Sequence, residues 1–330
     1  FLECMERAMN KHNLFTSSFK AKLLVGGKLL ALLALILAFL LSVMPQYEGD
    51  YNASLIDKVN RLESLDSPKI VLIGNSNLAF GMNSEELEAA FGLPVVNMGL
   101  HGGIGNEFHE RMALLNVQKG DIYIVCHSTF ADNGGIDDAT LTWLAIEDHF
   151  DLWRLLRWSD APTMLKGYPV YLRKCLDLWA PGYGNQETAV MDVYVRSAFN
   201  EYGDIEWPDE GLTFDFADYQ SYPPAIGDIT VARLNALNDT LTAQGATLLI
   251  AGYPIADTSA RAADADFDAF EESLRAQLHA PVISHYTDYI YPCEDFFNSS
   301  FHLNNVGKEL RTQQLISDLT AYWSAHPRNG

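Results

Sequence analysis

One long apolar run near the N-terminus places the tightest constraint on how this chain folds. Residues 23–44 are apolar or small apart from Ser42 and a single charged side chain, Lys28. About 20 apolar residues suffice to cross a bilayer as a helix, which satisfies its own backbone hydrogen bonds in lipid. Lys28 lies near the start of the run, where its long side chain can reach the interface. The run therefore predicts a transmembrane helix, with a tail at residues 1–22 and a juxtamembrane linker at residues 45–66.

The charges on either side of this run indicate its orientation. Lysines precede or enter it and acidic residues follow it: Lys11, Lys20, Lys22 and Lys28, against Glu48, Asp50 and Asp57. The positive-inside rule then keeps the N-terminus in the cytoplasm and exports the remainder, as in a single-pass protein of the cell membrane. A cleaved signal peptide is the alternative, although no small-x-small cleavage pattern follows the apolar region.

The composition of the chain indicates which classes of partner it does not bind. The chain carries 22 Lys and Arg against 43 Asp and Glu, a formal charge of −21. Nucleic-acid binding needs clustered Lys and Arg to neutralise phosphates, so we expect no nucleic-acid partner. No cluster of Cys, His, Asp or Glu has the spacing of a metal site, so no metal is predicted either.

Short apolar runs alternate with helical segments over residues 67–326. The runs at 70–73, 95–98, 121–126 and 247–251 have the length and composition of strands buried on both faces. A further short strand is expected near 281–285, and a last helix from 305 to 322. Strands that alternate with helices predict an α/β domain with a parallel, doubly wound sheet.

The stretch from about residue 131 to residue 228 interrupts this alternation. It predicts an irregular, mostly helical insertion that holds five of the six tryptophans: Trp143, Trp153, Trp158, Trp179 and Trp207. An insertion beside a catalytic crevice can shape substrate binding, and exposed aromatic rings can stack on sugars. The alternative is that these tryptophans pack the insertion against itself or against the core.

Two loops far apart in the chain carry a serine and a histidine. Ser76 follows the first predicted strand, and His302 precedes the last predicted helix. Serine is a weak nucleophile until a base takes its proton, and histidine has a pKa suited to that task. Loops at the carboxyl ends of parallel strands meet in one crevice. We therefore predict that Ser76 and His302 form a catalytic pair.

Three blocks of the sequence resemble the SGNH (GDSL-like) hydrolase superfamily, in particular its membrane-anchored bacterial members. The block with the nucleophilic serine matches Gly74-Asn75-Ser76-Asn77 after the first strand. The Asn-x-Gly-x-x-Gly block after the second strand matches Asn97, Gly99 and Gly102. The last block matches His302-Leu-Asn-Asn-Val-Gly307. The resemblance spans roughly residues 67–130 and 245–323.

This resemblance implies a three-layer α/β/α, flavodoxin-like fold and an acyl-serine mechanism that needs no cofactor. It implies that Ser76 is the nucleophile and His302 the general base. The oxyanion hole would take the backbone amides of Ser76 and Gly102, together with an asparagine side chain after the third strand. The nearest counterpart of that asparagine here is Asn133.

The sequence departs from the family pattern where an aspartate usually precedes the histidine by three or four residues. Those positions hold Ser299 and Asn298. Asn298 can orient His302 through its amide oxygen but brings no charge. Asp295 can supply a carboxylate if the loop bends back, and a Ser-His dyad without an acidic partner is the third alternative.

The resemblance implies an extracytoplasmic serine esterase or O-acyltransferase that acts on acyl esters of cell-surface polysaccharide or wall polymers. Its other partner is membrane lipid, through residues 23–44. The alternative is a catalytically degenerate protein that binds glycans or assists a membrane-bound acyltransferase in surface-polymer acylation. The missing aspartate favours this alternative.

Overall fold

The computed structural model describes most of the chain, which divides between Gln46 and Tyr47 into two compact units. The described residues are 19–43, 47–66, 68–112, 114–132, 135–147, 149–178, 193–206, 226–260 and 262–327. In the first unit they form one helix, α2 (Phe19–Ser42). Its segment Lys20–Ser42 is long and apolar enough to cross a membrane, as the sequence predicts.

The second unit is a mixed α/β structure around a parallel sheet, which confirms the prediction from the alternating pattern. The sheet has the strand order β2-β1-β3-β4. Its strands are β1 (Ile70–Ile73), β2 (Val95–Asn97), β3 (Ile122–Val125) and β4 (Thr247–Ile250). Every residue of β1 and β3 is buried, so both faces of the sheet are covered there. A single parallel bridge from Ile250 to Val282 continues the sheet beyond β4, where a short strand is expected.

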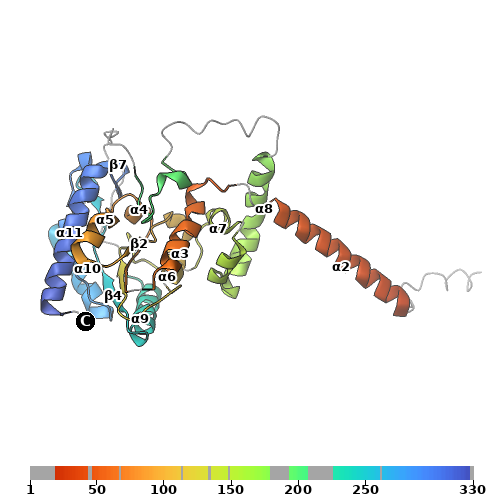
Figure 1. The fold of residues 1–330 in the computed structure, drawn as a ribbon, viewed down its shortest axis with the longest axis horizontal. Coiled ribbons are helices and arrows are strands. Elements are labelled where there is room, and N and C mark those ends of the chain that lie inside the picture. Colours follow the sequence, from red (N-terminus) through yellow and green to blue (C-terminus); the bar gives the residue numbers. More distant parts are fainter. Residues whose placement is uncertain are drawn as a thin grey trace, which may run out of the picture. The chain divides into compact units, whose positions relative to one another are not determined.

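Helices and small strand pairs surround this sheet (Figure 1). The helices outside the insertion are α3 (Leu55–Ser64), α4 (Ser76–Ala79), α5 (Ser84–Phe91), α6 (Asn106–Met112), α9 (Asp228–Ala243), α10 (Asp264–Gln277) and α11 (Asn305–Ala325). Two pairs of short strands follow β4: β5 (Ile255–Ala256) with β6 (Ile290–Tyr291), and β7 (Phe296–Ser299) with β8 (His302–Leu303). The antiparallel pair β7-β8 is a tight hairpin just before α11.

A continuous apolar core holds α5 and α11 against one face of the sheet. Alternate residues of β1, Ile70 and Leu72, belong to the same buried cluster as Leu87 of α5 and Leu315 of α11. Figure 1 shows these two helices side by side. Truncating a buried leucine of such a core to alanine costs about 2–5 kcal/mol of folding stability.

The segment 47–66, expected to be a linker, packs into the second unit. It forms the 3₁₀ turn η1 (Tyr51–Ser54) and helix α3. Leu55, Val59 and Leu62 are fully buried, at the spacing that places side chains on one face of a helix. The linker between the two units is therefore shorter than the sequence suggests.

The described part of the insertion is mostly helical, as predicted. It contains α7 (Ala139–Ile146), η3 (Phe150–Leu155), η4 (Trp158–Asp160), α8 (Ala161–Leu178) and η6 (Arg196–Ala198). The Trp143 indole donates to the Met164 carbonyl at 3.0 Å and meets the ring of Trp153 edge-on, so these two tryptophans are packing residues. Trp158 is almost fully exposed, and Trp179 and Trp207 lie outside the described residues.

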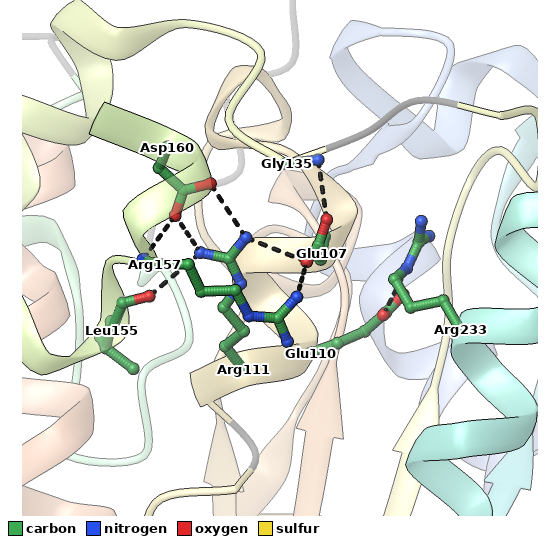
Figure 2. A network of polar contacts seen from close by, with 8 residues as sticks. All are labelled: Glu107, Glu110, Arg111, Gly135, Leu155, Arg157, Asp160 and Arg233. Carbon is green, nitrogen blue, oxygen red and sulfur yellow. Dashed lines mark hydrogen bonds and ion pairs between the residues drawn. The ribbon is translucent and has the colours of Figure 1, made fainter. Parts of the chain in front are cut away.

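A network of ion pairs fastens the insertion to the sheet domain (Figure 2). Arg111 of α6 pairs with Asp160, just before α8, and with Glu107 at 3.0 Å. Arg233 of α9 pairs with Glu110 at 2.6 Å. Arg157 also pairs with Glu107, so three arginines face three carboxylates. The charges of the network balance and Arg111 is buried. We therefore interpret the network as a structural connection of α6 to α9 and to η4, just before α8.

Candidate active site

The structure brings Ser76 and His302 into hydrogen-bond contact across 226 positions of sequence, with Ser76 Oγ 2.8 Å from His302 Nε2. Ser76 is the first residue of α4, and two residues separate it from the end of β1. Asn75 caps this short helix, because its side-chain oxygen accepts from the Asn77 amide at 3.1 Å. A Cβ on Gly74 would lie 2.8 Å from a terminal methyl of Leu78 and 3.0 Å from the backbone oxygen of Cys126, so a side chain there would be crowded. The sharp turn holds the Ser76 hydroxyl at the carboxyl edge of the sheet.

The β7-β8 hairpin positions His302. The His302 amide donates to the Ser299 hydroxyl at 3.2 Å. On the imidazole, Nδ1 lies 2.8 Å from Asn298 Oδ1. Of the two orienting residues considered from the sequence, the structure therefore places Asn298 against the histidine. Asp295 lies at the start of the hairpin, where its backbone carbonyl accepts from Asn304, and burial raises the pKa of its carboxyl.

A tyrosine from the insertion completes this row of contacts. Asn298 Nδ2 donates to the Tyr194 hydroxyl at 3.0 Å. In this arrangement the amide oxygen of Asn298 faces His302 and its NH₂ faces Tyr194. The Tyr194 ring also lies 5.7 Å from the ring of Tyr51. Sequence reasoning missed Tyr194, and no local motif marks it.

The surroundings of His302 keep its imidazole neutral. Phe80 stacks on the imidazole, with ring centroids 4.2 Å apart and planes 9° apart. Burial, followed by the nearby His101, lowers the pKa of His302 to about 3. A neutral imidazole at pH 7 can accept a proton, but a pKa this low also makes it a weak base. A charged partner at position 298 would act in the opposite direction.

The ends of three neighbouring strands meet beside Ser76. Gly102, in the 3₁₀ turn η2 (Gly102–Ile104) after β2, is adjacent to Asn75: a Cβ on Gly102 would lie 3.5 Å from the Asn75 side chain. Asn75 Nδ2 donates to the Ser128 hydroxyl, just past β3, at 2.7 Å. Asn133 lies outside the described residues. Two residues after β3 therefore contact the turn that carries Ser76: Ser128, and Cys126, whose carbonyl accepts from Asn77 Nδ2 at 3.0 Å. Sequence reasoning missed Ser128.

Buried polar groups hold the turn after β2. Asn97 Oδ1 accepts from the Gly99 amide at 2.9 Å, while Asn97 Nδ2 donates to Leu78 O and to Asp204 Oδ1. Asp204 also accepts from Ser84, and burial raises the pKa of its carboxyl. Asn97 therefore links the turn that carries Ser76 to Asp204 of the insertion. No sequence motif reveals this link.

Among the residues that the structure describes, no three His, Cys, Asp or Glu side chains gather closely enough to hold a metal ion. What the site presents is a hydroxyl, an imidazole and an amide in series, next to turns that carry backbone N–H groups. Such an arrangement suits acyl transfer through a serine.

Comparisons of this chain with protein-family models, curated proteins and solved structures find no match.

Proposed function

We propose that this chain is a membrane-anchored serine esterase or O-acyltransferase of the SGNH type. One observation carries the proposal: the contacts in series from Ser76 to His302 and from His302 to Asn298, each 2.8 Å long. A lone serine or histidine has many structural uses. A serine hydroxyl on Nε2 of an imidazole whose Nδ1 faces an acceptor is the arrangement that activates a nucleophile.

In the first half-reaction, Ser76 Oγ attacks the acyl carbon of an ester while its proton passes to His302 Nε2. The carbonyl oxygen becomes an oxyanion, which the amides of Ser76 and Gly102 would stabilise. Removing one such donor costs about 3 kcal/mol where it has been measured in other enzymes. The intermediate then collapses, the C–O bond to the alcohol breaks, and His302 protonates the departing alkoxide. The acyl group remains on Ser76.

In the second half-reaction, His302 takes a proton from the acceptor hydroxyl, whose oxygen attacks the acyl-serine. Ser76 leaves with the proton from His302, and the free enzyme returns. Water as acceptor makes the protein an esterase, and a sugar hydroxyl makes it a transferase. In both cases Nδ1–H of His302 donates to Asn298 Oδ1, which keeps the imidazole in the productive tautomer.

The finer features of the fold belong to the same proposal. The order β2-β1-β3-β4, the burial of β1 on both faces and the covering of one face by α5 and α11 support a three-layer α/β/α, flavodoxin-like arrangement. We assign α2 as an uncleaved anchor with the N-terminus in the cytoplasm, on the basis of the flanking lysines. The catalytic unit then faces acyl esters of surface polysaccharide or wall polymers outside the cell.

A second candidate function has one specific observation in its favour. The amide of Asn298 brings no charge to His302, and the pKa of His302 is lowered to about 3. Both features weaken the base. A protein with this site can bind acylated glycans, or assist a membrane-bound acyltransferase, without turnover.

Product analysis tests the proposal and separates its branches. The full chain in detergent is given acetyl esters, with and without an oligosaccharide acceptor, beside Ser76→Ala and His302→Ala. Free acetate that both substitutions abolish identifies an esterase, and acetylated acceptor identifies a transferase. The opposite outcome is a wild type that releases no more product than Ser76→Ala but that, immobilised on a column, still retains acylated glycan. That outcome would support the binding function in place of the enzymatic one.

A further inference from the structure

Helix α8 presents an apolar stripe that the described residues of the domain leave largely exposed. Its inner face carries the buried residues Met164, Tyr171 and Cys175. A different side of the helix carries five apolar residues at intervals of three and four: Pro162, Leu165, Pro169, Leu172 and Leu176. Leu165 is 71% exposed, and Leu172 is half-buried. A row of this spacing lies along one side of a helix, so the stripe is continuous.

Large aromatic side chains precede this stripe. Trp158, four residues before Pro162, is 96% exposed, and Phe150 is 55% exposed. Isolated exposed apolar residues are common on soluble proteins. Several large ones in one region are typical of a surface that binds a membrane or another protein. Tryptophan is the residue most typical of the membrane–water interface, because its ring is apolar and its N–H is polar.

The charge of this region is opposite to that of the chain as a whole. Helix α8 contains three basic residues against one aspartate, whereas the whole chain has a formal charge of −21. Lys166 and Arg173 lie along one side of the apolar stripe, both are exposed, and Arg173 pairs with Asp177 at 3.8 Å. An apolar stripe bordered by basic side chains is the pattern of a helix that lies in an interface with anionic headgroups.

The segment that joins the two units is short. The Tyr47 amide, at the start of the second unit, donates to the Glu147 carboxylate just after α7. The same carboxylate accepts from the hydroxyl of Tyr171 on α8 at 2.6 Å. Four residues separate Ser42 from Tyr47, so the chain between these two spans at most about 18 Å. If α2 spans the membrane, this short segment limits how far the α7–α8 pair can lie from the bilayer surface.

We infer that the stripe of α8, together with Trp158, rests on the lipid surface and that Lys166 and Arg173 contact anionic headgroups. The inference depends on the anchoring role proposed for α2. Contact of the stripe with lipid would give the catalytic unit a second attachment to the membrane. That attachment would restrict rotation of the unit relative to the bilayer.

Site-specific photocrosslinking of the full chain tests this contact. A benzoylphenylalanine replaces Leu165, and in separate variants Leu33 of α2 or Leu310 of α11. Leu310 is a matched control, because it is an exposed leucine on a helix at the opposite edge of the second unit in Figure 1. The variants are reconstituted in nanodiscs of phosphatidylcholine with phosphatidylglycerol, irradiated, and examined by mass spectrometry for lipid adducts.

We expect lipid adducts at positions 33 and 165 and none at position 310. Adding Lys166→Glu and Arg173→Glu should reduce the yield at position 165 severalfold and leave the yield at position 33 unchanged. Adducts at 33 without adducts at 165 would overturn the inference and leave the anchor intact. Absence of adducts at both positions would overturn the anchor as well. A protein adduct at 165 in native membranes, in place of lipid, would assign the stripe to a protein partner.

Discussion

Nδ1 of His302 lies 2.8 Å from Oδ1 of Asn298, where an amide stands in the place of the carboxylate that the resemblance leads one to expect. The amide accepts the Nδ1 hydrogen and so fixes the tautomer. It does not supply the charge that would stabilise an imidazolium, and burial lowers the pKa of His302 to about 3. An aspartate would both orient the imidazole and stabilise the charge of the imidazolium. In this site Asn298 therefore orients the imidazole without stabilising that charge.

Replacing the amide with a carboxylate should restore the missing charge. We expect Asn298→Asp to raise the pKa of His302, because the imidazolium gains a charged partner. His302 must be neutral to accept the serine proton, so the acidic limb of the pH–rate profile should move to higher pH. The plateau rate should rise as well, since loss of the aspartate from a protease triad lowers kcat by about 10⁴. The rate of labelling by a fluorophosphonate from pH 3 to pH 9 measures both effects, and a profile identical to the wild type would contradict them.

Tyr194 should act on the site through Asn298. Tyr194→Phe removes the hydroxyl that accepts from Asn298 Nδ2, so the amide is free to flip and the labelling rate should fall. A neutral hydrogen bond is worth about 1 kcal/mol, which corresponds to roughly a fivefold change. Tyr51→Phe is the matched control, because the buried Tyr51 hydroxyl has no hydrogen-bond partner among the described residues. Equal rates in the two variants, at equal melting temperatures, would show that Tyr194 only packs.

Two glycines of the block after β2 should differ sharply in their tolerance of a side chain. A Cβ on Gly99 would lie 2.7 Å from the backbone nitrogen of Ala79, whereas one on Gly102 would meet nothing closer than 3.5 Å. Gly99→Ala should therefore lower the free energy of unfolding by about 1–3 kcal/mol, the usual range for overpacking. Gly102→Ala should change it by less than about 0.5 kcal/mol. Urea unfolding of both variants measures the difference, and equal midpoints would contradict the close approach at Gly99.

His109 should make folding stability depend on pH. It is fully buried, neither ring nitrogen has a hydrogen-bond partner among the described residues, and burial lowers its pKa to about 3. Between pH 6.5 and pH 3 the unfolded chain then binds more protons than the folded chain, so the free energy of unfolding falls as the pH falls through that window. His302 adds a change of the same sign. His109→Leu should make this slope shallower without removing it, as urea unfolding at a series of pH values would show. An unchanged slope would contradict the burial of an unpartnered imidazole.

The sequence was sufficient to predict the sheet and the meeting of Ser76 with His302. Runs such as Ile70–Ile73 are apolar at every position, which is the mark of a strand covered on both faces. The parallel sheet follows from their alternation with helices, and its carboxyl edge brings the two loops together. α11 also begins at Asn305, as expected.

What the sequence did not reveal depends on contacts between distant segments. Tyr194 and Ser128 reach the site from other parts of the chain, and nothing in their immediate neighbours marks them. After α6 ends at Met112, Asn116 adopts a positive φ of 121°, a conformation that is uncommon for residues other than glycine. Residues 47–66 belong to the folded unit because Leu55, Val59 and Leu62 find partners there, and their own spacing gives only the helix.

Covalent labelling by a fluorophosphonate probe tests the central claim, that His302 activates Ser76. The full chain in detergent is treated at pH 7 beside Ser76→Ala, His302→Ala and Ser128→Ala, and the modified residue is located by mass spectrometry. We expect stoichiometric labelling at Ser76. Ser76→Ala and His302→Ala should both abolish this labelling, whereas Ser128→Ala should retain it. A wild-type protein that is folded and takes up no label, or that keeps its label in His302→Ala, would contradict it.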